Sequence, residues 1–501
     1  MTEDRGREAE ILAARRASLE RLRAKGIEPF ALRFDQTDLA ADLHAAHADL
    51  AAGEDRDTHA SVAGRVVLAR RHGKLTFLVI RDRSGELQLF CEEATLGADG
   101  YALLDEIDLG DIIGATGTIT RTKRGELSLR ADRLTMLTKA LRPLPEKWHG
   151  LKDPDLQQRQ RYLHLIADET PRTYVMARAA VLKTMRRVLD GRGFVEFEGP
   201  TLQSVAGGAN ARPFTTHHLA LDAPMKLRIS LELYLKQMQV GGIERVYELG
   251  RIFRNEGIDR DHNPEFTMLE AYQAYGDYET MMELSETLVV ECCRAVNPIL
   301  GRTADTLAVV VAGHQVDLSP PFDRLSMLGA VSKVAGEEIT LGRPDLHQIA
   351  ARLEVQVDDA WGPGMVVKEL FEKLVEGTLV RPTFVCDFPR DVSPLARPHR
   401  SDPSLTEHFD LIAAGIELVT AFSELTDPDE QRAKFELQQQ MREVLGDEAH
   451  PLDEDFLRAL EHGMPPVGGL GMGIDRLLLL LTDAQSLRDL IMFPQHRPEP
   501  V

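Results

Sequence analysis

One short stretch of the chain concentrates side chains that could bind an anion. Residues 243–275 read IERVYELGRIFRNEGIDRDHNPEFTMLEAYQAY, a pattern that predicts two strands joined by a polar loop from about Asn255 to Pro264. Guanidinium groups are the preferred bidentate partners of phosphate and carboxylate, so the loop is predicted to hold an anionic ligand. Its charged or titratable side chains are Arg254, Glu256, Arg260 and His262.

The second strand of this pair is predicted to present an aromatic ring and a carboxylate on one surface. Side chains alternate along a strand, so Phe266, Met268, Glu270 and Tyr272 should share a face. Any one of these charges could belong to a surface ion pair on an exposed hairpin. The convergence of so many functional groups favours a binding site over that alternative.

Two later segments are candidates for the same site. In IELVTAFSELTDP, Thr420, Phe422 and Glu424 fall on one strand face, and Glu417 falls on the other unless a bulge intervenes. The segment GGLGMGIDRLLLLL predicts a glycine-rich approach to a very apolar helix with Arg476 in its first turns. A buried helix with one capping charge would explain the last segment equally well.

The elements before residue 140 predict a small β-barrel. From Ser61 the pattern becomes alternating and β-rich, with turns at Ser84-Gly85 and Arg124-Gly125. About five short strands in roughly 80 residues is the size of an OB barrel, a fold often used on single-stranded nucleic acid. Phe77 and Gln88 fall on neighbouring predicted strands, where a ring and an amide could converge on a ligand. Phe77 could equally be part of the core.

Helices and a linker surround this barrel. Residues 5–25 predict a basic amphipathic helix, which either packs as a solvated face or contacts nucleic acid, and Ala-rich 38–52 predicts more helix. The proline-rich segment LRPLPEKWHG predicts a linker. Thr170 and Pro171 predict a cap and a first-turn proline for a helix that ends at Gly191 and Gly193.

Composition bounds the class of protein. The chain has 501 residues, of which 43% are hydrophobic and 28% charged, so it is neither collagen-like nor wholly disordered and is long enough for two or more domains. The formal charge of −21 argues against nonspecific nucleic-acid binding. Residues 61–140, however, carry twelve Lys or Arg and eleven Asp or Glu, so the acidic excess lies elsewhere.

Cysteine usage and hydropathy point to a soluble protein of a reducing compartment. The longest aliphatic run, Leu477 to Leu481, is far shorter than the roughly 20 residues that span a bilayer, and the N-terminus has no apolar signal core. The cysteines include one adjacent pair and no C-x-x-C, which suggests neither a disulfide framework nor a zinc site. We expect a cytoplasmic protein without a membrane segment.

With these residues in hand, the chain resembles class II (class IIb) lysyl-tRNA synthetases of the bacterial type, from about residue 5 to residue 497. GRGFVEFEGPTL is similar to the first class-defining motif, RIFRNEGIDRDHNPEFTMLE to the second, and GLGMGIDRLLLL to the third. The segments GGANARPFTTHH, LELYLKQM, DVSPLAR and FSELTDP also match.

The resemblance implies an α+β protein in which an N-terminal OB-fold anticodon-binding domain precedes a class II catalytic domain, an antiparallel β-sheet flanked by helices. The expected ranges are a helical extension over 1–57, the OB fold over 58–140, a linker over 141–170 and the catalytic domain over 171–501. The implied activity is that of a lysine--tRNA ligase: L-lysine and ATP form lysyl-adenylate, with Mg²⁺ as cofactor, and lysine then passes to tRNA(Lys). The implied assembly is a homodimer joined partly through the first motif, around Pro200.

The resemblance also implies roles for individual residues. Arg254 and Arg476 would be catalytic, and Asp410 and Glu417 would hold magnesium. The ATP contacts would be Arg254, Glu256, His262, Phe266, Glu417 and Arg476. The lysine contacts would be Gly208, Glu232, Glu270, Tyr272, Thr420, Phe422 and Glu424, with Glu424 and Tyr272 at the ε-ammonium. The anticodon readers would be Phe77, Gln88 and Glu126.

Three positions depart from the family pattern. Thr420 stands where many members carry Asn, Ile416 where Arg is common, and Asp410 where Glu is usual. The first change could alter the polarity of the lysine pocket, and the last shortens a magnesium ligand by one methylene. No essential charge is lost, so we expect retained activity.

Two kinds of alternative stay open at this point. One is an aspartyl or asparaginyl synthetase of the same class, whose pocket would need cations where this chain offers carboxylates. A paralogue that lysylates a protein or a lipid is another enzyme alternative, although such relatives lack the barrel or carry membrane segments. The other kind is a catalytically inert protein that binds tRNA or senses an amino acid.

Overall fold

The computed structural model describes residues 2–144, 151, 153–209, 211–259, 262–440 and 452–497, so Arg260 lies outside the described residues. The chain divides into two compact units, Met1–Lys152 and Asp153–Val501. This division falls inside the range 141–170 that the sequence predicts as a linker.

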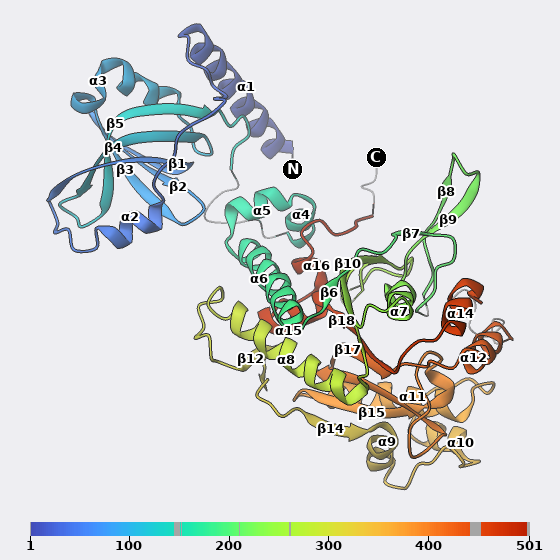
Figure 1. Ribbon diagram of the computed structural model, residues 1–501. Coiled ribbons are helices and arrows are strands. Elements are labelled where there is room, and N and C mark those ends of the chain that lie inside the picture. The colour runs from blue at the N-terminus through green and yellow to red at the C-terminus, as the bar shows by residue number, and fades with distance from the viewer. Residues whose placement is uncertain are drawn as a thin grey trace. The chain divides into compact units, whose positions relative to one another are not determined.

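The first unit contains a closed five-stranded barrel (Figure 1). Its strands are β1 (Asp55–His72), β2 (Leu75–Arg81), β3 (Glu86–Glu92), β4 (Ile112–Arg121) and β5 (Leu127–Thr138), in the order β1-β2-β3-β5-β4. The helix α3 (Glu93–Ala102) and the 3-10 turn η1 (Leu103–Glu106) connect β3 to β4. The predicted OB fold is confirmed.

Two helices precede the barrel, α1 (Thr2–Ala24) and α2 (Ala40–Ala46), and both predicted helices are therefore present, the second shorter than expected. Arg15 donates hydrogen bonds to the carbonyl oxygens of Leu109, Ala140 and Arg142 at 2.9–3.0 Å. Arg21 and Lys25 pair with the buried carboxylate of Glu106 at 2.9 and 3.3 Å. These three cations therefore fasten α1 to its own domain, which favours the structural interpretation of the basic helix for them.

The second unit is built on an eight-stranded sheet of order β14-β15-β16-β17-β18-β11-β10-β6. All neighbouring strands are antiparallel except β14–β15 and β10–β6, which are parallel. The predicted antiparallel sheet is thus confirmed, with one parallel pair at each edge. The strands are β6 (Val195–Glu196), β10 (Arg245–Phe253), β11 (Glu265–Ala274), β14 (Asp323–Ser326), β15 (Thr383–Pro389), β16 (Leu405–Ala413), β17 (Ile416–Ser423) and β18 (Val467–Gly473).

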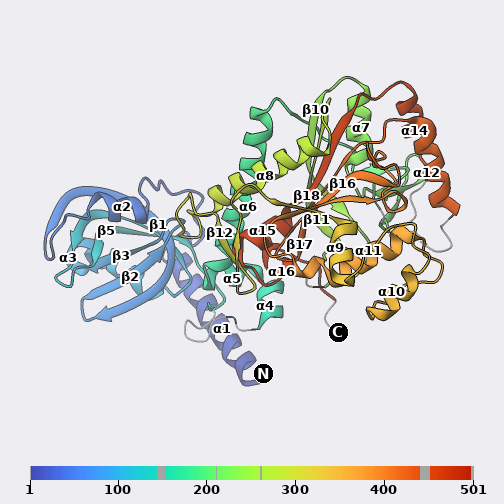
Figure 2. The same ribbon diagram turned by 90° about the horizontal axis from the view of Figure 1, so that it is seen from below.

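Helices cover both faces of this sheet (Figure 2). One face packs Leu269, Val419 and Met472 against α6 (Thr170–Gly191), α8 (Tyr278–Val296) and α15 (Ile474–Thr482) in the largest apolar core. On the other face α7 (Glu232–Val240) lies on β10 and β11, while α9 (Met327–Ala335) and α11 (Pro363–Leu374) lie on β15. The strands between these two groups of helices carry the candidate site.

The start of α6 differs from the prediction. Thr170 is already helical and the N-cap is Glu169, while the carboxylate of Asp168 accepts the backbone N–H of Thr170 at 2.7 Å. Before it lie α4 (Pro154–Arg159) and α5 (Arg161–Ala167). The buried guanidinium of Arg161 donates to the carbonyl oxygen of Met492 at 3.0 Å, which fastens these helices to the C-terminal part of the same unit.

Shorter elements complete the second unit: β7 (Leu202–Gln203), β8 (Thr215–His218), β9 (Ala223–Leu227), β12 (Ala308–Val311), β13 (His314–Asp317), α10 (Leu346–Arg352), η2 (Glu376–Thr378), η3 (Arg390–Val392), α12 (Pro428–Gln440), α14 (Glu454–Glu461) and α16 (Leu487–Leu490). Within the described ranges, no helix combines the length and the apolar character that crossing a membrane requires. All four cysteines are buried free thiols.

Candidate functional site

The strand β11 presents the four side chains predicted to share a face. It pairs antiparallel with β10, and its odd-numbered residues Leu269 and Ala271 enter the apolar core on the opposite side. The face that remains lines a cavity of about 250 Å³, here called the acidic cavity. Its lining includes Gly208, Ser230, Glu232, Arg254, Met268, Glu270, Tyr272, Ser393, His408, Thr420, Phe422, Gly469 and Gly471.

Glycines of the neighbouring strand β18 make room for the acidic cavity. Gly469 pairs with Tyr272 on one side and with Phe422 on the other, and Gly471 pairs with Glu270 and Thr420. A Cβ built on Gly469 would lie 2.5 Å from Cε1 of Tyr272 and still closer to Oε1 of Glu424. Because glycine within a strand often marks a close approach of other groups, these residues form the floor of the cavity. The glycine-rich segment leads into the apolar helix α15 as predicted, and the structure shows that it is itself a central strand of the sheet.

Glu270 is a buried acid held by three donors. The hydroxyl of Ser230 and the backbone N–H of Leu231 donate to its Oε1, both at 2.9 Å, and the hydroxyl of Tyr272 donates to its Oε2 at 3.0 Å. Burial, reinforced by the charge of Glu232, raises the pKa of Glu270 to about 7. Near pH 7 the carboxyl group of Glu270 is therefore partly protonated, and it can either accept or donate a hydrogen bond.

A fully buried lysine, Lys236 of α7, lies between two of the predicted lysine-binding carboxylates. Its Nζ lies 2.5 Å from Oε1 of Glu232 and 2.5 Å from Oε2 of Glu424. Burial and the nearby carboxylates of Glu232 and Glu270 raise the pKa of Glu424, while Lys236 acts to lower it. Glu424 does not line the acidic cavity and instead lines a groove of about 970 Å³ behind it, together with Arg397 and Arg400.

A β-bulge in β17 brings Glu417 to the same face as Thr420. Asp410 pairs with Thr420 and Leu411 with Val419, but Ile412 pairs with Glu417, so Leu418 is an extra residue in the strand. The sequence places Glu417 on the other strand face from Thr420 unless a bulge intervenes, and the structure contains that bulge. Leu418 and Val419 both enter the large core, which explains why the ladder shifts at this point.

The bulge places the two predicted magnesium ligands on one face of adjacent strands. Burial tends to raise the pKa of Asp410, but His408 lowers it below its ordinary range. Burial and the charge of Asp410 raise the pKa of Glu417. In the described part of the chain, no group of three or more His, Cys, Asp or Glu side chains is arranged to hold a metal by itself. Two carboxylates do suit Mg²⁺, which usually completes its shell with phosphates and water.

A second cavity of about 290 Å³, here called the arginine cavity, adjoins these residues. It is lined by Arg254, Glu256, Gly257, His262, Asn263, Pro264, Phe266, Met268, Glu417, Leu418, Thr420, Gly471, Gly473, Asp475, Arg476 and Leu487. Arg254 lines both cavities. All six residues predicted to bind ATP therefore line one hollow.

Two arginines provide the positive charge of the arginine cavity. The guanidinium of Arg254 lies 5.3 Å from the ring centre of Phe266 and donates to the carbonyl oxygen of Ile229 at 3.3 Å. Burial lowers the pKa of Arg254. Arg476 donates to Oε1 of Glu417 at 3.0 Å, so a predicted phosphate contact is paired with a predicted metal ligand.

The polar loop between β10 and β11 is open to solvent. Glu256 and His262 are both exposed, and Nδ1 of His262 lies 2.9 Å from a carboxylate oxygen of Asp259. Asp475 ties the far side of the cavity to the sheet, since it accepts the N–H of Thr267 at 2.9 Å and pairs with Arg178. The loop side is therefore accessible while the helix side is fixed.

Sequence reasoning missed a histidine beneath the acidic cavity. His408 stacks on Phe388 with ring centres 3.8 Å apart, and its Nδ1 lies 2.7 Å from the hydroxyl of Ser393. Its Nε2 lies 3.0 Å from Oγ1 of Thr420 and 3.2 Å from Oδ1 of Asp410. The period-two pattern of residues 406–410 could have placed His408 beside Asp410 on one face.

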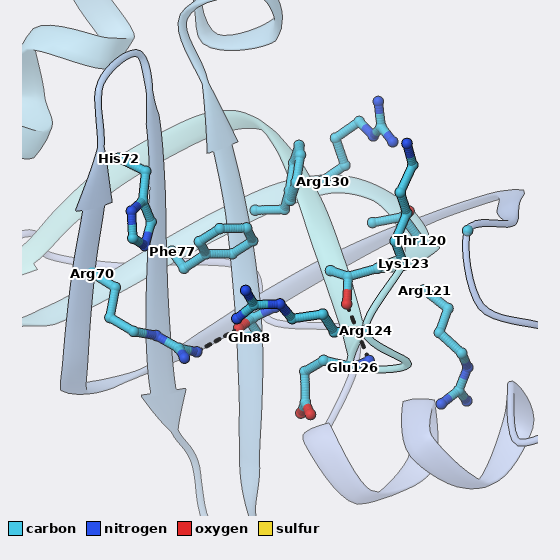
Figure 3. A pocket seen from close by; sticks show the side chains of 13 residues that line it. Arg70, His72, Phe77, Gln88, Thr120, Arg121, Lys123, Arg124, Glu126 and Arg130 are labelled. Atoms are coloured by element: carbon cyan, nitrogen blue, oxygen red, sulfur yellow. Dashed lines mark hydrogen bonds between the residues drawn. The ribbon is translucent and has the colours of Figure 1, made fainter.

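The barrel carries a separate hollow of about 660 Å³, shown in Figure 3. Phe77 is half-buried, lies outside the barrel core and packs edge-on against Phe90 with ring centres 5.3 Å apart. The amide of Gln88 is engaged, since it accepts from Arg70 at 3.0 Å and donates to Ser128 at 2.8 Å. The other lining residues are Gly53, His72, Thr120, Arg121, Thr122, Lys123, Arg124, Glu126 and Arg130.

This hollow suits a nucleic-acid strand. Figure 3 shows Phe77, Gln88 and Glu126, the three predicted readers, facing the same space as the basic side chains. A half-buried ring that lines a hollow beside arginines provides a stacking surface within a positive groove, the arrangement used on single-stranded nucleic acid. The structural alternative for Phe77, membership of the core, is therefore wrong.

Comparisons with known proteins agree with this geometry. Residues 153–497 match the family model described as tRNA synthetases class II (D, K and N), and residues 60–137 match the OB-fold nucleic acid binding domain. The chain is 50% identical over 495 residues to the lysine--tRNA ligase of Synechococcus sp. (strain CC9311), covering 98% of this chain and 100% of that protein. It is 44% identical over 492 residues to that of Bacillus subtilis (strain 168), covering 97% of both.

Proposed function

The chain belongs to the class II tRNA synthetases of the D, K and N group, and from this premise we propose that it activates L-lysine with ATP and transfers lysine to the 3′ end of tRNA(Lys). The activity is that of an ATP-dependent ligase. The observation that carries the choice of lysine is a cluster of buried carboxylates: Glu232 and Glu270 line the acidic cavity next to the arginine cavity, and Glu424 lies against Gly469 of its floor. An aspartate or asparagine pocket would require different charges there.

In the first step the carboxylate of lysine attacks the α-phosphorus of ATP, and the bond to the leaving pyrophosphate breaks. Arg254 would contact both the α-phosphate and the lysine carboxylate, since it lines both cavities. Arg476 would bind the γ-phosphate and Phe266 would stack on adenine, with Glu256 and His262 contacting ATP from the open loop. Positioning and charge neutralisation provide most of the catalysis that phosphoryl chemistry needs.

Asp410 and Glu417 would hold Mg²⁺, which neutralises phosphate charge when bound. Arg476 has to exchange its contact with Glu417 for a phosphate contact in this scheme. No protein side chain has to act as a nucleophile, because the carboxylate of lysine supplies the attacking oxygen.

Lysine would be recognised by charge at both ends. Glu424 and Tyr272 would bind the ε-ammonium, Glu232 and the backbone of Gly208 the α-ammonium, with Glu270 as support and Thr420 and Phe422 along the side chain. Glu424 lies behind Tyr272 and Gly469, outside the acidic cavity. The carboxylate of Glu424 would therefore have to move toward the cavity when lysine binds. A buried carboxylate left without a cation is costly, which allows discrimination by about 10⁴-fold or more.

In the second step the ribose hydroxyl at the end of tRNA(Lys) takes the lysyl group and AMP leaves. We propose that Phe77, Gln88 and Glu126 read the anticodon in the barrel hollow. We also propose a homodimer in the cytoplasm. The exposed apolar side chains of Val195 and Leu202, which flank Pro200, support a partner surface at this segment.

The test is ATP–pyrophosphate exchange with each of the twenty amino acids in separate wells. Lysine alone should support rapid exchange, with saturation below the millimolar range. Exchange with aspartate or asparagine, or with no amino acid, would refute the proposed specificity or the proposed catalysis. Sedimentation of the purified chain tests the dimer independently.

A further inference from the structure

The lysine of α7 is a buried cation that pairs with two of the proposed substrate-binding carboxylates. Lys236 is fully buried, and its ammonium contacts Glu232 from the preceding helical turn and Glu424 from the end of β17. Each carboxylate oxygen lies 2.5 Å from the same nitrogen, so the two oxygens are at most about 5 Å apart. Without this ammonium, two like charges would face each other in a buried site.

We propose that Lys236 is a positioning residue for substrate recognition, which holds Glu232 and Glu424 together and fixes the charge of the pocket that accepts lysine. The inference rests on the proposed function and deepens it. Glu232 and Glu424 pair with Lys236, and the buried Glu270 interacts electrostatically with both of these carboxylates, so the group contains three acids and one ammonium. When all three are ionised the local charge is −2, which matches the two ammonium groups of free lysine. A neutral residue at 236 would leave −3, and the carboxylates would keep protons instead.

The geometry distinguishes this role from a simple packing contact. Both carboxylate oxygens of Glu424 are buried without a hydrogen-bond partner among the described residues, although Oε2 lies 2.5 Å from Nζ of Lys236. The other oxygen, Oε1, lies against Gly469 beside the ring of Tyr272, so it would be the oxygen that accepts a hydrogen bond from a substrate ammonium. Lys236 would stay in place when lysine binds, because Glu232 from its own helix also holds it.

The charged and titratable groups around Lys236 come from several elements. Glu232 lies on the same helix and Glu424 follows β17, and both affect Lys236 directly. Glu270 and Tyr272 of β11 interact electrostatically with these carboxylates. Lys434 of α12 is also near enough to affect it electrostatically. His408 of β16 lines the same cavity. Loss of the Lys236 charge should therefore change the ionisation of the acids more than that of any other group.

The experiment compares Lys236→Met with the wild-type enzyme in ATP–pyrophosphate exchange between pH 6.0 and 8.5. We expect the KM for lysine at pH 7 to rise by about 30-fold or more, as expected when one partner of a buried charge pair is lost, and the KM for ATP to change by less than about threefold. The pH at which lysine binds with half-maximal affinity should rise by about one unit or more. Lys236→Arg, which keeps the charge, should restore most of the affinity.

Lys139 offers a matched control in the other unit. It is also buried, and its ammonium pairs with Asp108 and Asp111 at 2.6 and 2.9 Å. Lys139→Met should lower thermal stability without changing the KM for lysine or its pH profile.

Three results would overturn the proposal while leaving the proposed function intact. The first is a folded Lys236→Met enzyme whose KM for lysine and pH profile match those of the wild type. The second is failure of Lys236→Arg to improve on Lys236→Met. The third is failure of both Lys236→Met and Lys236→Gln to fold while Lys139→Met folds, since a structural role would then suffice. A wild-type enzyme without lysine-dependent exchange would instead refute the proposed function.

Discussion

Replacing Gly469 by alanine tests the acidic cavity without removing any charge. Gly469 lies in β18 between Tyr272 and Phe422, and its missing side chain leaves room for Glu424 and the ring of Tyr272. The added Cβ would lie 2.5 Å from Cε1 of Tyr272, whereas carbon atoms in contact are ordinarily about 3.5 Å apart. The ring, the carboxylate or the strand must therefore move by about 1 Å.

The magnitude follows from this displacement. A misplacement of about 1 Å in a binding group can cost roughly 100-fold in rate, which corresponds to about 2.7 kcal/mol. Overpacking of a close-packed site costs about 1–3 kcal/mol of folding stability in addition. Gly469→Ala should therefore lower kcat/KM for lysine by about 100-fold, mainly through KM, while the KM for ATP stays within about threefold.

The assay is lysine-dependent ATP–pyrophosphate exchange, with thermal unfolding measured on the same preparation. Gly342→Ala is the matched control, because a Cβ there meets no atom within 4 Å and the residue is exposed. This control should change neither parameter. A folded Gly469→Ala enzyme with an unchanged KM for lysine would show that Tyr272 and Glu424 do not bind the substrate.

Three further predictions concern the other parts of the site. Arg254→Ala should slow pyrophosphate exchange, with a loss of about 2–5 kcal/mol of transition-state stabilisation. Substitution of its exposed neighbour, Arg251→Ala, should leave the rate unchanged. Equal rates for the two variants would contradict the proposed contact of Arg254 with the α-phosphate and the lysine carboxylate. Phe77→Ala should weaken tRNA binding by about 1–3 kcal/mol in a filter assay and leave exchange without tRNA unchanged, and unaltered tRNA affinity would refute stacking. Because the pKa of Glu270 is near 7 and its ionised form is needed opposite an ammonium, lysine affinity should fall as pH drops through 7, by up to about tenfold per unit. Calorimetry in buffers of different ionisation heat should then record proton release on binding near pH 7, which Glu270→Gln should reduce.

Sequence reasoning succeeded where a local pattern determines position. The face shared by Phe266, Met268, Glu270 and Tyr272 follows from the two-residue period of a strand, and β11 keeps that period throughout its pairing with β10. The OB barrel follows in the same way from five short alternating segments. The resemblance added the roles of these residues, which alternation alone cannot provide.

The remaining features depend on contacts between distant segments. The bulge at Leu418 arises because two consecutive residues of β17 enter one core, and a single strand pattern cannot reveal that. Glu232 and Lys236 have the spacing of an ordinary surface pair on a helix. Their burial results from the packing of α7 on β11 and from Glu424, which lies about 190 residues later in the chain. The glycine run before α15 is not predicted to be a strand, because its pairing with β11 and β17 depends on segments far away in the chain.

The regular spacing of side chains on one face of β11 fixes the distance between two proposed contact residues. A strand advances by about 3.4 Å per residue, so Phe266 and Tyr272 are separated by about 20 Å along a strand that pairs with β10 over this whole stretch and with β18 from Met268 onward. The proposed binding sites for adenine and for the side-chain amine of the amino acid would therefore lie at a fixed distance from each other. The side-chain ammonium of a shorter diamino acid such as ornithine would end about one carbon–carbon bond before the proposed ε-ammonium site. A hydrogen-bonded strand cannot shorten to close this gap. We therefore expect selectivity for the length of the substrate to depend on the β11 backbone, separately from the selectivity for its charge, which we assign to the acids.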